Sequence, residues 1–319
     1  MKDVAIIIVS YNVRELLDDC LASVYASRGV SFDVCVVDNA SRDGSAALVH
    51  ECYPQVDLIE SPHNGGYAYA NNLGVNRLKA VAEAGETQAR AYRYILLLNP
   101  DTRLDETALA MAVTFMDGRP EVGIMGPKLL RQDGSLDLAC RRSFPTPEVS
   151  LYRMIGLSKL FPRSRRFARY NLTFIDPSAE AEVDAVAGAF MLLRQEAVQQ
   201  AGLLDERFFM YAEDVDWALR IKAQGWKVVY NPAITVLHVK GASSRSNHLK
   251  TTFEFYRSML LFYKKHYARS TFPLLHWLIV AGIYLRGGMA FLQAVLAMPR
   301  AGQPHVRGKT RTHSIGRNS

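Results

Sequence analysis

The sequence has 319 residues, of which 49% are hydrophobic and 22% charged, so it can bury a full core as one large domain or one domain with an appendage. Its net charge is +7, and five Lys or Arg but no acid follow residue 298, which indicates an anionic partner such as nucleic acid or a membrane surface. Four cysteines without a Cys-x-x-Cys pair, and no visible signal peptide, exclude the usual zinc and disulfide frameworks and predict a reducing, cytosolic setting.

The first hundred residues alternate between strand and helix patterns. The expected elements are strands at 4–9, 32–37, 56–60 and 95–98, separated by helices at 16–24, 44–52 and 68–84. This alternation predicts a parallel sheet with right-handed crossovers.

The strand at residues 95–98 is the centre of the prediction. Its apolar residues do not alternate with polar ones, as in a strand buried on both faces of a parallel sheet. Pro100 ends the strand, so Asp101 reaches the C-terminal edge of the sheet, where ligands bind in open α/β folds. A carboxylate there suits Mg²⁺ or Mn²⁺ carrying nucleotide phosphates; the alternative is a solvated Asp in a turn. Asp38 ends the second strand in the same way and would accept hydrogen bonds from a base or ribose.

Beyond residue 101 the pattern is less regular. Residues 141–181 show little periodicity, although a basic stretch at 163–169 stands out. The expected elements are a helix at 106–116, a strand at 122–125, a hairpin at 128–140, strands at 183–186 and 188–194, a helix at 195–201, a helix ending near 225 and a strand from 227 to 238.

Glu213, Asp214 and Asp216 crowd together just before a helix. Helix capping is the competing explanation, but it needs only one acid. Like charges held close together raise at least one pKa, which suits a general base. We therefore predict Asp214 as the base, with Glu213 binding an acceptor. Trp217 would either offer the acceptor an apolar ring face or pack in the core.

Two later residues extend the predicted site. His238 follows a strand and is a candidate second ligand of a metal held by Asp101, although a lone histidine is more often structural. Arg245, in a loop of small residues, would neutralise a leaving diphosphate.

Residues 271–298 are almost wholly apolar, broken by His276 and by Arg286-Gly287-Gly288. Neither half reaches the roughly 20 residues of a spanning helix. A single span would place Arg286 in the bilayer at a cost of about 2.5–3.5 kcal/mol or more. Because both flanks are basic, we expect an in-plane amphipathic pair or a shallow re-entrant hairpin on the cytoplasmic face of the membrane. The alternative is a pair of core helices or a dimer interface.

Seven motifs occur together in a fixed order. They are Val9-Ser-Tyr-Asn12, Val37-Asp-Asn-Ala-Ser41, Asn64-Gly-Gly-Tyr67, Leu98-Asn-Pro-Asp101, Gly188-Ala-Phe-Met191, Glu213-Asp-Val-Asp216 and His238. The set, over about residues 3–265, resembles inverting glycosyltransferases of family 2, and among them bacterial rhamnosyltransferases. The resemblance implies an α/β fold of GT-A type. Its central sheet would be mainly parallel and flanked by helices, with a Rossmann-like nucleotide-binding half and C-terminal apolar helices. We expect a catalytic domain at 1–265, membrane-associating helices at 266–300 and a basic, disordered tail at 301–319.

The resemblance also implies roles for single residues. A nucleotide-sugar site would contain Ser10, Tyr11, Asn12, Asp38, Asn64, Gly65 and Asn99. Asp101 would be the metal-binding acid of the family's Asp-x-Asp motif, Asp214 the catalytic base, and Gly188 a neighbour of the acceptor. Asn99 replaces the first acid of that motif, which removes one carboxylate and leaves the strictness of dependence on Mg²⁺ or Mn²⁺ open.

The implied reaction moves a sugar from a nucleotide-sugar to a hydroxyl of a polyprenyl-diphosphate-linked saccharide, in cell-surface polysaccharide synthesis. The first choice of donor is dTDP-L-rhamnose and the second is a UDP-activated sugar. Asp214 would take the hydroxyl proton as the oxygen attacks the anomeric carbon, while the metal and Arg245 stabilise the leaving diphosphate. The enzyme would work at the inner face of the cell membrane, and its oligomeric state is left open.

Two other classes stay open at this point. Nucleotidyl transfer also uses a metal-bound nucleotide on an α/β sheet, but it would release pyrophosphate and would not need Asp214. A binding protein whose basic tail contacts nucleic acid has composition alone in its favour, so we expect no nucleic-acid partner. NAD-dependent and P-loop chemistry are disfavoured because neither glycine-rich motif occurs.

Overall fold

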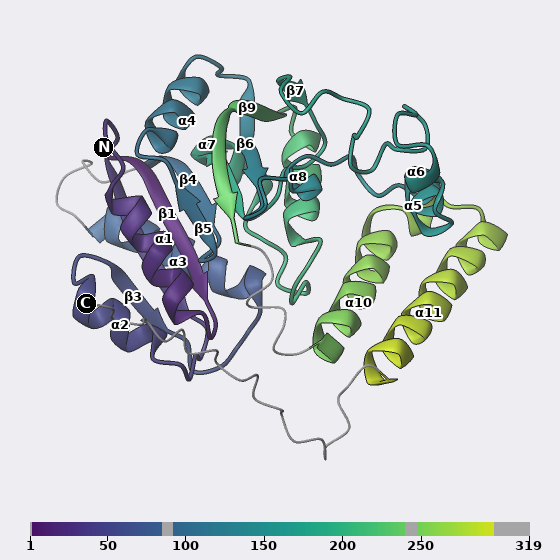
Figure 1. The fold of residues 1–319 in the computed structure, drawn as a ribbon, viewed down its shortest axis with the longest axis horizontal. Helices are drawn as coiled ribbons and strands as arrows, with labels where there is room; N and C mark the ends of the chain where they lie inside the picture. Colours follow the sequence, from purple (N-terminus) through teal and green to yellow (C-terminus); the bar gives the residue numbers. More distant parts are fainter. Residues whose placement is uncertain (1, 85–91, 240–247, 297–319) are drawn as a thin grey trace, which may run out of the picture.

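The computed structural model describes residues 2–84, 92–239 and 248–296. Arg245 therefore lies outside the described residues, as does the predicted tail at 301–319. Figure 1 shows a central sheet flanked by helices, with two further helices, α10 and α11, side by side at one end of the molecule.

The first half of the sheet is parallel, as the sequence predicts. Its strands run in the order β3, β2, β1, β4, and every neighbouring pair is parallel. Their bounds are Lys2–Ser10 for β1, Phe32–Asp38 for β2, Asp57–Glu60 for β3 and Tyr92–Leu98 for β4. Ile6 in β1 and Leu96 in β4 are fully buried, which explains why these strands carry no polar alternation. The carboxyl ends of β1, β2 and β4 consequently meet at one edge.

The second half of the sheet is mixed. The strand β8 (Phe190–Arg194) lies between β4 and β6 (Val122–Leu130) and is antiparallel to both, while β9 (Lys227–His238) is parallel to β6. Two short strands, β5 (Thr102–Leu104) and β7 (Ala181–Glu182), pair with β9 in the antiparallel sense. The register of β5 places Thr102 opposite His238, so the chain just after Asp101 is held beside the end of β9.

Helices flank this sheet and connect its strands. They are α1 (Arg14–Tyr25), α2 (Ser45–Cys52), α3 (Tyr67–Ala84), α4 (Ala108–Asp117), α7 (Gln195–Ala201) and α8 (Glu213–Ala223). Apolar residues from these helices and from both halves of the sheet form one continuous core. The fold is thus α/β with flanking helices, in agreement with the sequence prediction.

The segment that showed little periodicity is held by side chains more than by regular elements. It contains only the short helices α5 (Pro147–Met154) and α6 (Leu157–Leu160), with a 3₁₀ turn at Leu138–Cys140 before it. Arg141 is 1% exposed and donates to the carbonyls of Ile175 and Asp176 at 2.6 and 2.9 Å. Its guanidinium also lies 5.1 Å from the ring centroid of Tyr230. A buried arginine that gathers distant carbonyls leaves no periodic signal in the sequence.

The C-terminal apolar region differs from the prediction. After α10 (His248–His266) and a 3₁₀ turn (Ala268–Ser270), α11 runs without a break from Pro273 to Leu296, so the expected pair of short helices is wrong. A Cβ on Gly287 would meet the ring of Tyr256 at 3.1 Å, so this glycine permits close packing of α11 on α10 rather than ending the helix. By length and composition α11 could cross a membrane, and 6% of its most apolar window is buried.

Candidate active site

The predicted nucleotide-binding residues meet where β1 and β2 end. Ser10 and Asp38 face each other in the parallel register and are 0% and 4% exposed. Asp38 Oδ2 accepts a hydrogen bond from the Ser41 amide at 2.9 Å. In contrast, Ser10 Oγ and Asp38 Oδ1 are buried and have no hydrogen-bond partner within residues 2–84, 92–239 and 248–296. Buried polar atoms are nearly always paired in native proteins, so two unpaired oxygens side by side mark a place for a polar ligand.

The loops around these strand ends are fixed by amides. Asn39 donates to Asn64 Oδ1 at 3.0 Å and accepts from the Gly65 amide at 3.1 Å. Asn12 has a positive φ of 53° and accepts from the Arg42 amide at 2.8 Å. Tyr11, next to it, is 37% exposed. These bonds fix the loops at the strand ends, and the exposed Tyr11 lies at the same edge of the sheet.

A carboxylate–histidine–carboxylate cluster lies at the end of β4 and β9. His238 Nε2 is 3.3 Å from Asp101 Oδ1, and His238 Nδ1 is 3.0 Å from Asp137 Oδ2. All three residues are less than 9% exposed. Burial disfavours the charged imidazole, but the contacts with the two carboxylates outweigh it and raise the pKa of His238 to about 9.

This cluster fits one divalent metal ion. Asp101 Oδ1 is buried and, despite the short contact with His238, has no aligned hydrogen-bond donor. Asp137 would orient the imidazole ring of His238 through its contact with Nδ1, as second carboxylates do in metal sites. No group of three or more His, Cys, Asp or Glu suited to a metal occurs among the described residues. With two protein ligands, phosphates and water would have to supply the rest, which is usual for Mg²⁺.

Asp214 is held at the start of α8 by three donors. Its Oδ2 accepts from Arg142 at 2.6 Å and from the Gly188 amide at 3.0 Å, and its Oδ1 accepts from the Val215 amide at 2.8 Å. Charge-assisted bonds of this kind fix both the orientation and the negative charge of a carboxylate. A Cβ on Gly188 would lie 3.6 Å from the Cβ of Asp214, so glycine permits this close approach.

Glu213, the neighbouring acid, has a different environment. It is 7% exposed, and its Oε2 is buried without a hydrogen-bond partner. Burial, and then the charge of Asp214, raise the pKa of Glu213 to about 8. The two acids therefore differ: Asp214 accepts from three donors, whereas the surroundings of Glu213 favour its protonated form, which can donate a hydrogen bond.

Tyr67 connects the two parts of the site. Its hydroxyl donates to the Gly188 carbonyl at 2.9 Å, next to Asp214. Tyr67 follows directly after the loop that Asn39 holds through the Gly66 carbonyl. The Tyr67 backbone amide donates to the Phe209 carbonyl at 2.7 Å. Burial, together with the charges of Glu213, Asp214 and Asp101, raises the pKa of Tyr67 well above its usual value. The charges of Asp101 and of the acidic pair therefore act on the same tyrosine.

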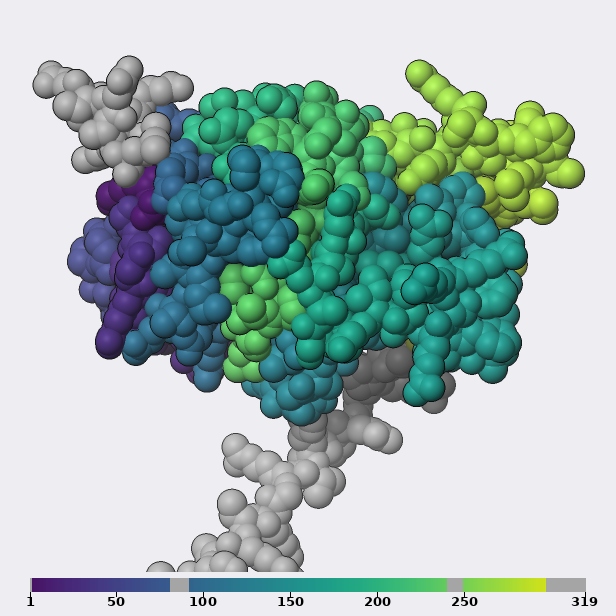
Figure 2. Space-filling view, turned by 90° about the horizontal axis from the view of Figure 1, so that it is seen from above, coloured from purple at the N-terminus to yellow at the C-terminus, as the bar shows by residue number. Residues whose placement is uncertain are grey.

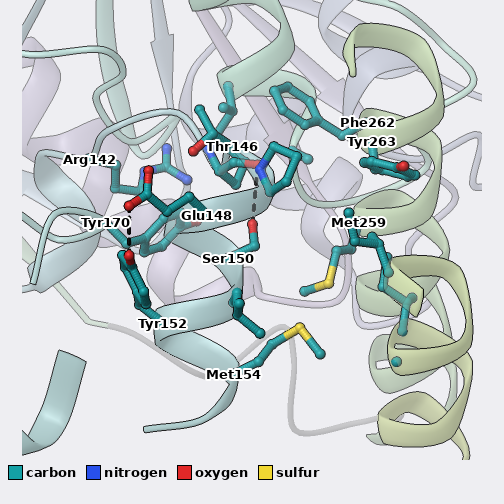
Figure 3. Close-up of a pocket in the computed structure, with 18 of the residues that line it drawn as sticks. Arg142, Thr146, Glu148, Ser150, Tyr152, Met154, Tyr170, Met259, Phe262 and Tyr263 are labelled. Carbon is teal, nitrogen blue, oxygen red and sulfur yellow. Dashed lines mark hydrogen bonds between the residues drawn. The ribbon is translucent and has the colours of Figure 1, made fainter. Parts of the chain in front are cut away.

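A pocket of about 910 Å³ opens beside the acidic pair (Figure 3). Arg142, Glu213 and Asp214 line its inner end, while α5, α10 and α11 provide its walls. An acceptor entering this pocket would bring a hydroxyl towards Asp214.

Several sequence predictions change at this point. Trp217 is fully buried in the core and donates to the Gly202 carbonyl at 2.7 Å, which contradicts its predicted contact with an acceptor. Arg142 and Asp137, which hold Asp214 and His238, were not predicted. Arg142 lies in the segment with little periodicity and Asp137 in the predicted hairpin at 128–140, and no local pattern marked either of them.

The sequence matches one family model, described as "Glycosyltransferase like family 2", over residues 2–256. The N-acetylglucosaminyl-diphospho-decaprenol L-rhamnosyltransferase of Mycobacterium tuberculosis is 30% identical over 264 residues, which cover 80% of this chain and 84% of that protein. The rhamnosyltransferase WbbL of Escherichia coli K12 is 27% identical over 264 residues, 79% of this chain and 92% of that protein.

Solved structures with a similar fold are more distant in sequence. The mannosyltransferase PcManGT of Pyrobaculum calidifontis, in complex with GDP-Man and Mn²⁺, has a TM-score of 0.53 and 16% identity, covering 93% of this chain and 76% of that one. Residues 1–349 of Staphylococcus aureus TarS give a TM-score of 0.51 and 14% identity, covering 82% of this chain and 64% of that one.

Proposed function

This chain belongs to glycosyltransferase family 2 and is an enzyme, and from that premise we propose that it transfers L-rhamnose from dTDP-rhamnose to a lipid-linked saccharide. The acceptor that we propose is a polyprenyl-diphosphate-linked sugar, because two relatives that match about four fifths of this chain are named as rhamnosyltransferases and one is named for such an acceptor. The transfer reaction would take place on the cytoplasmic face of the membrane, to which α11 offers an apolar surface.

The observation that carries the proposal is the position of Asp214 in the lining of the pocket. A general base must be ionised and within reach of the hydroxyl that it deprotonates. Asp214 is paired with Arg142 and lines the pocket that opens between α5, α10 and α11. As its carboxylate takes the proton, the acceptor oxygen attacks the anomeric carbon and the nucleoside diphosphate leaves from the opposite face, which inverts the configuration.

Glu213 and Arg142 support this step. Protonated Glu213 can donate to an acceptor oxygen without repelling Asp214. Arg142 Nη2 donates to the Val186 carbonyl at 2.7 Å as well as to Asp214, so this second bond fixes the nitrogen that orients the base. Orientation of this kind lowers the entropic cost of bringing the hydroxyl and the sugar together.

The donor would bind at the sheet edge. Ser10 and Asp38 have free oxygens for the nucleoside, and Asp101 with His238 would hold Mg²⁺ or Mn²⁺ against the diphosphate. The ion would supply positive charge for the leaving group. Asn99 accepts from Thr102 through its backbone carbonyl and leaves its side-chain amide to the donor rather than to the metal.

The test is a transfer assay with Asp214→Asn. dTDP-rhamnose and a panel of UDP-sugars are offered with a prenyl-diphosphate-linked acceptor, and donor binding is followed by thermal unfolding. We expect transfer to fall by about 10²–10⁴-fold, as for loss of a general base, while donor protection is retained. Asp19→Asn, an exposed aspartate on α1 in an ion pair with Arg103, is the matched control. If Asp214→Asn transfers sugar at the wild-type rate, Asp214 is not the base; if no donor protects the wild type, the enzyme uses another donor class.

A further inference from the structure

The pocket beside Asp214 is much longer than a sugar needs. Away from the acidic pair it is apolar, with walls formed by Leu151, Met154, Met259, Phe262, Leu278 and Ile283. Met154 on α5 and Met259 on α10 face each other across it (Figure 3). At about 910 Å³ it is at the upper end of the range for small-molecule sites, which is about 300–1,000 Å³. A saccharide at the acidic end would leave this apolar half unfilled.

The basic stretch noted in the sequence lies at the side of this pocket. Arg169 lines it and also lines a neighbouring pocket of about 290 Å³, together with Arg165 and Arg166. Glu148 lines both pockets as well, but its Oε1 accepts from the Tyr152 hydroxyl at 2.6 Å and lies 3.4 Å from Arg166 Nε. Three guanidinium groups against one occupied carboxylate leave a positive site, and arginine binds phosphate oxygens through paired donors.

We propose that this pocket binds the isoprenoid chain of the acceptor between α5, α10 and α11, with the acceptor's diphosphate on Arg165, Arg166 and Arg169. The proposal rests on the proposed function, because it takes the acceptor to be a lipid-linked saccharide. The two neighbouring pockets offer the three chemistries of such a molecule: carboxylates for a sugar, arginines for a diphosphate and apolar walls for a hydrocarbon chain.

The outer face of α11 gives the chain a route from a lipid layer. Leu274, Trp277 and Leu285 are 65%, 67% and 67% exposed, and α11 stands at one end of the molecule next to the segment with α5 (Figure 2). Arg286 does not interrupt this surface, because its Nη1 donates to the Met154 carbonyl at the end of α5, at 2.7 Å. The wall of the pocket and the exposed apolar face are therefore two sides of one helix.

Binding can be tested without turnover, using farnesyl diphosphate as a soluble probe with the full-length protein. Inorganic diphosphate and farnesol serve as the head-only and chain-only probes. We expect farnesyl diphosphate to bind at least about tenfold more tightly than either, a difference of about 1.4 kcal/mol. Equal binding of farnesol would point to an unspecific apolar site, and equal binding of inorganic diphosphate would leave the chain without a role. Either result would overturn the proposal.

Two glycines of α11 provide a matched pair of variants. Gly282 lines the pocket, and a Cβ on it would lie 3.5 Å from Met154 Cε, whereas no described atom lies within 4 Å of a Cβ on Gly288. Gly282→Leu should weaken farnesyl diphosphate binding about tenfold or more, while Gly288→Leu leaves it unchanged, since both changes raise helix propensity alike. If Gly282→Leu unfolds at a lower temperature than the wild type in the absence of ligand, Ile279→Trp fills the pocket from the same wall instead. Unchanged binding in the filled variants contradicts the proposal.

The diphosphate end has its own pair. Arg169→Gln should reduce farnesyl diphosphate binding to the level of farnesol, whereas Arg163→Gln, exposed and outside both pockets, should have no effect. Equal losses in the two variants would indicate general charge attraction and would overturn the assignment. Because these measurements need no donor and no turnover, they fail independently of the transfer assay with Asp214→Asn.

Discussion

Glu213 and Asp214 are adjacent in the chain, yet their environments separate their roles. Arg142 and two amides donate to Asp214, while Glu213 has a buried oxygen with no partner among the described residues. This asymmetry comes from Arg142, which reaches α8 from the segment before α5. At the residue scale, the acidic motif alone does not distinguish the two acids, whereas the contact of Arg142 with Asp214 does.

The raised pKa of Glu213 predicts a pH-dependent stability. Between the ordinary glutamate value and about 8, the folded state keeps the proton while the unfolded state has released it, so wild-type stability falls as pH rises. Glu213→Gln removes this loss. We therefore expect the variant's advantage in free energy of unfolding to grow from about pH 4.5 to 8 and then level off. Urea unfolding at a series of pH values measures it, with Glu15→Gln on the exposed side of α1 as control. A constant difference across this range would contradict the assignment.

Asp137 provides a second residue-scale prediction. It is 1% exposed and contacts His238 through Nδ1, on the side of the ring away from Asp101. Removing such an orienting carboxylate typically costs 10–100-fold in metal affinity. We expect Asp137→Asn to weaken Mn²⁺ binding by about this factor, measured by calorimetry in the presence of a nucleoside diphosphate. Asp133→Asn, in the exposed turn of the same hairpin, is the control. Wild-type Mn²⁺ affinity in Asp137→Asn would remove His238 from the metal site.

At the element scale, the sequence was a good guide to the parallel half of the sheet and a poor one to the rest. Unalternated runs such as β1 and β4 can only be buried strands, and the polar residues after them must share one edge. The insertion of β8 between β4 and β6 is not encoded in any local pattern, because a short apolar strand looks the same in either direction. The sequence could therefore place Asp38 and Asp101 at the edge of the parallel half of the sheet. It could not place Asp137, because Asp137 lies outside that half.

The junction between α8 and α10 depends on one buried acid. Asp216 is 0% exposed and contacts Lys265, His266 and Arg220 at 2.6, 2.7 and 2.9 Å. Removing one partner of a buried ion network leaves uncompensated charge and costs about 3–5 kcal/mol. We expect Asp216→Ala to lower the free energy of unfolding by that amount in urea titrations. Glu182→Ala breaks an exposed pair with Lys222 and should cost less than about 1 kcal/mol. Similar costs for both variants would mean that α10 is held by apolar packing alone.

At the scale of the whole molecule, the apolar surface is concentrated on one helix. Most large hydrophobic residues that are exposed in the described chain belong to α11 or its approach, from Phe272 to Leu296. Exposed apolar patches of this kind mark sites of membrane or protein interaction. The sequence predicted membrane association but placed a break at Gly287, because glycine in a helix reads as a stop unless its packing partner, here Tyr256, is known.

Charges placed on this face test the membrane role without disturbing the core. Leu285 and Leu292 are 67% and 58% exposed, so Leu285→Glu with Leu292→Glu should leave the unfolding midpoint unchanged. The double variant should lose most of its co-sedimentation with vesicles of anionic phospholipid, since both carboxylates would have to enter the interface. Met111→Glu, an exposed methionine on α4, controls for the added charge. If the double variant sediments like wild type, α11 faces a protein partner or solvent, and the acceptor must reach the pocket by another side.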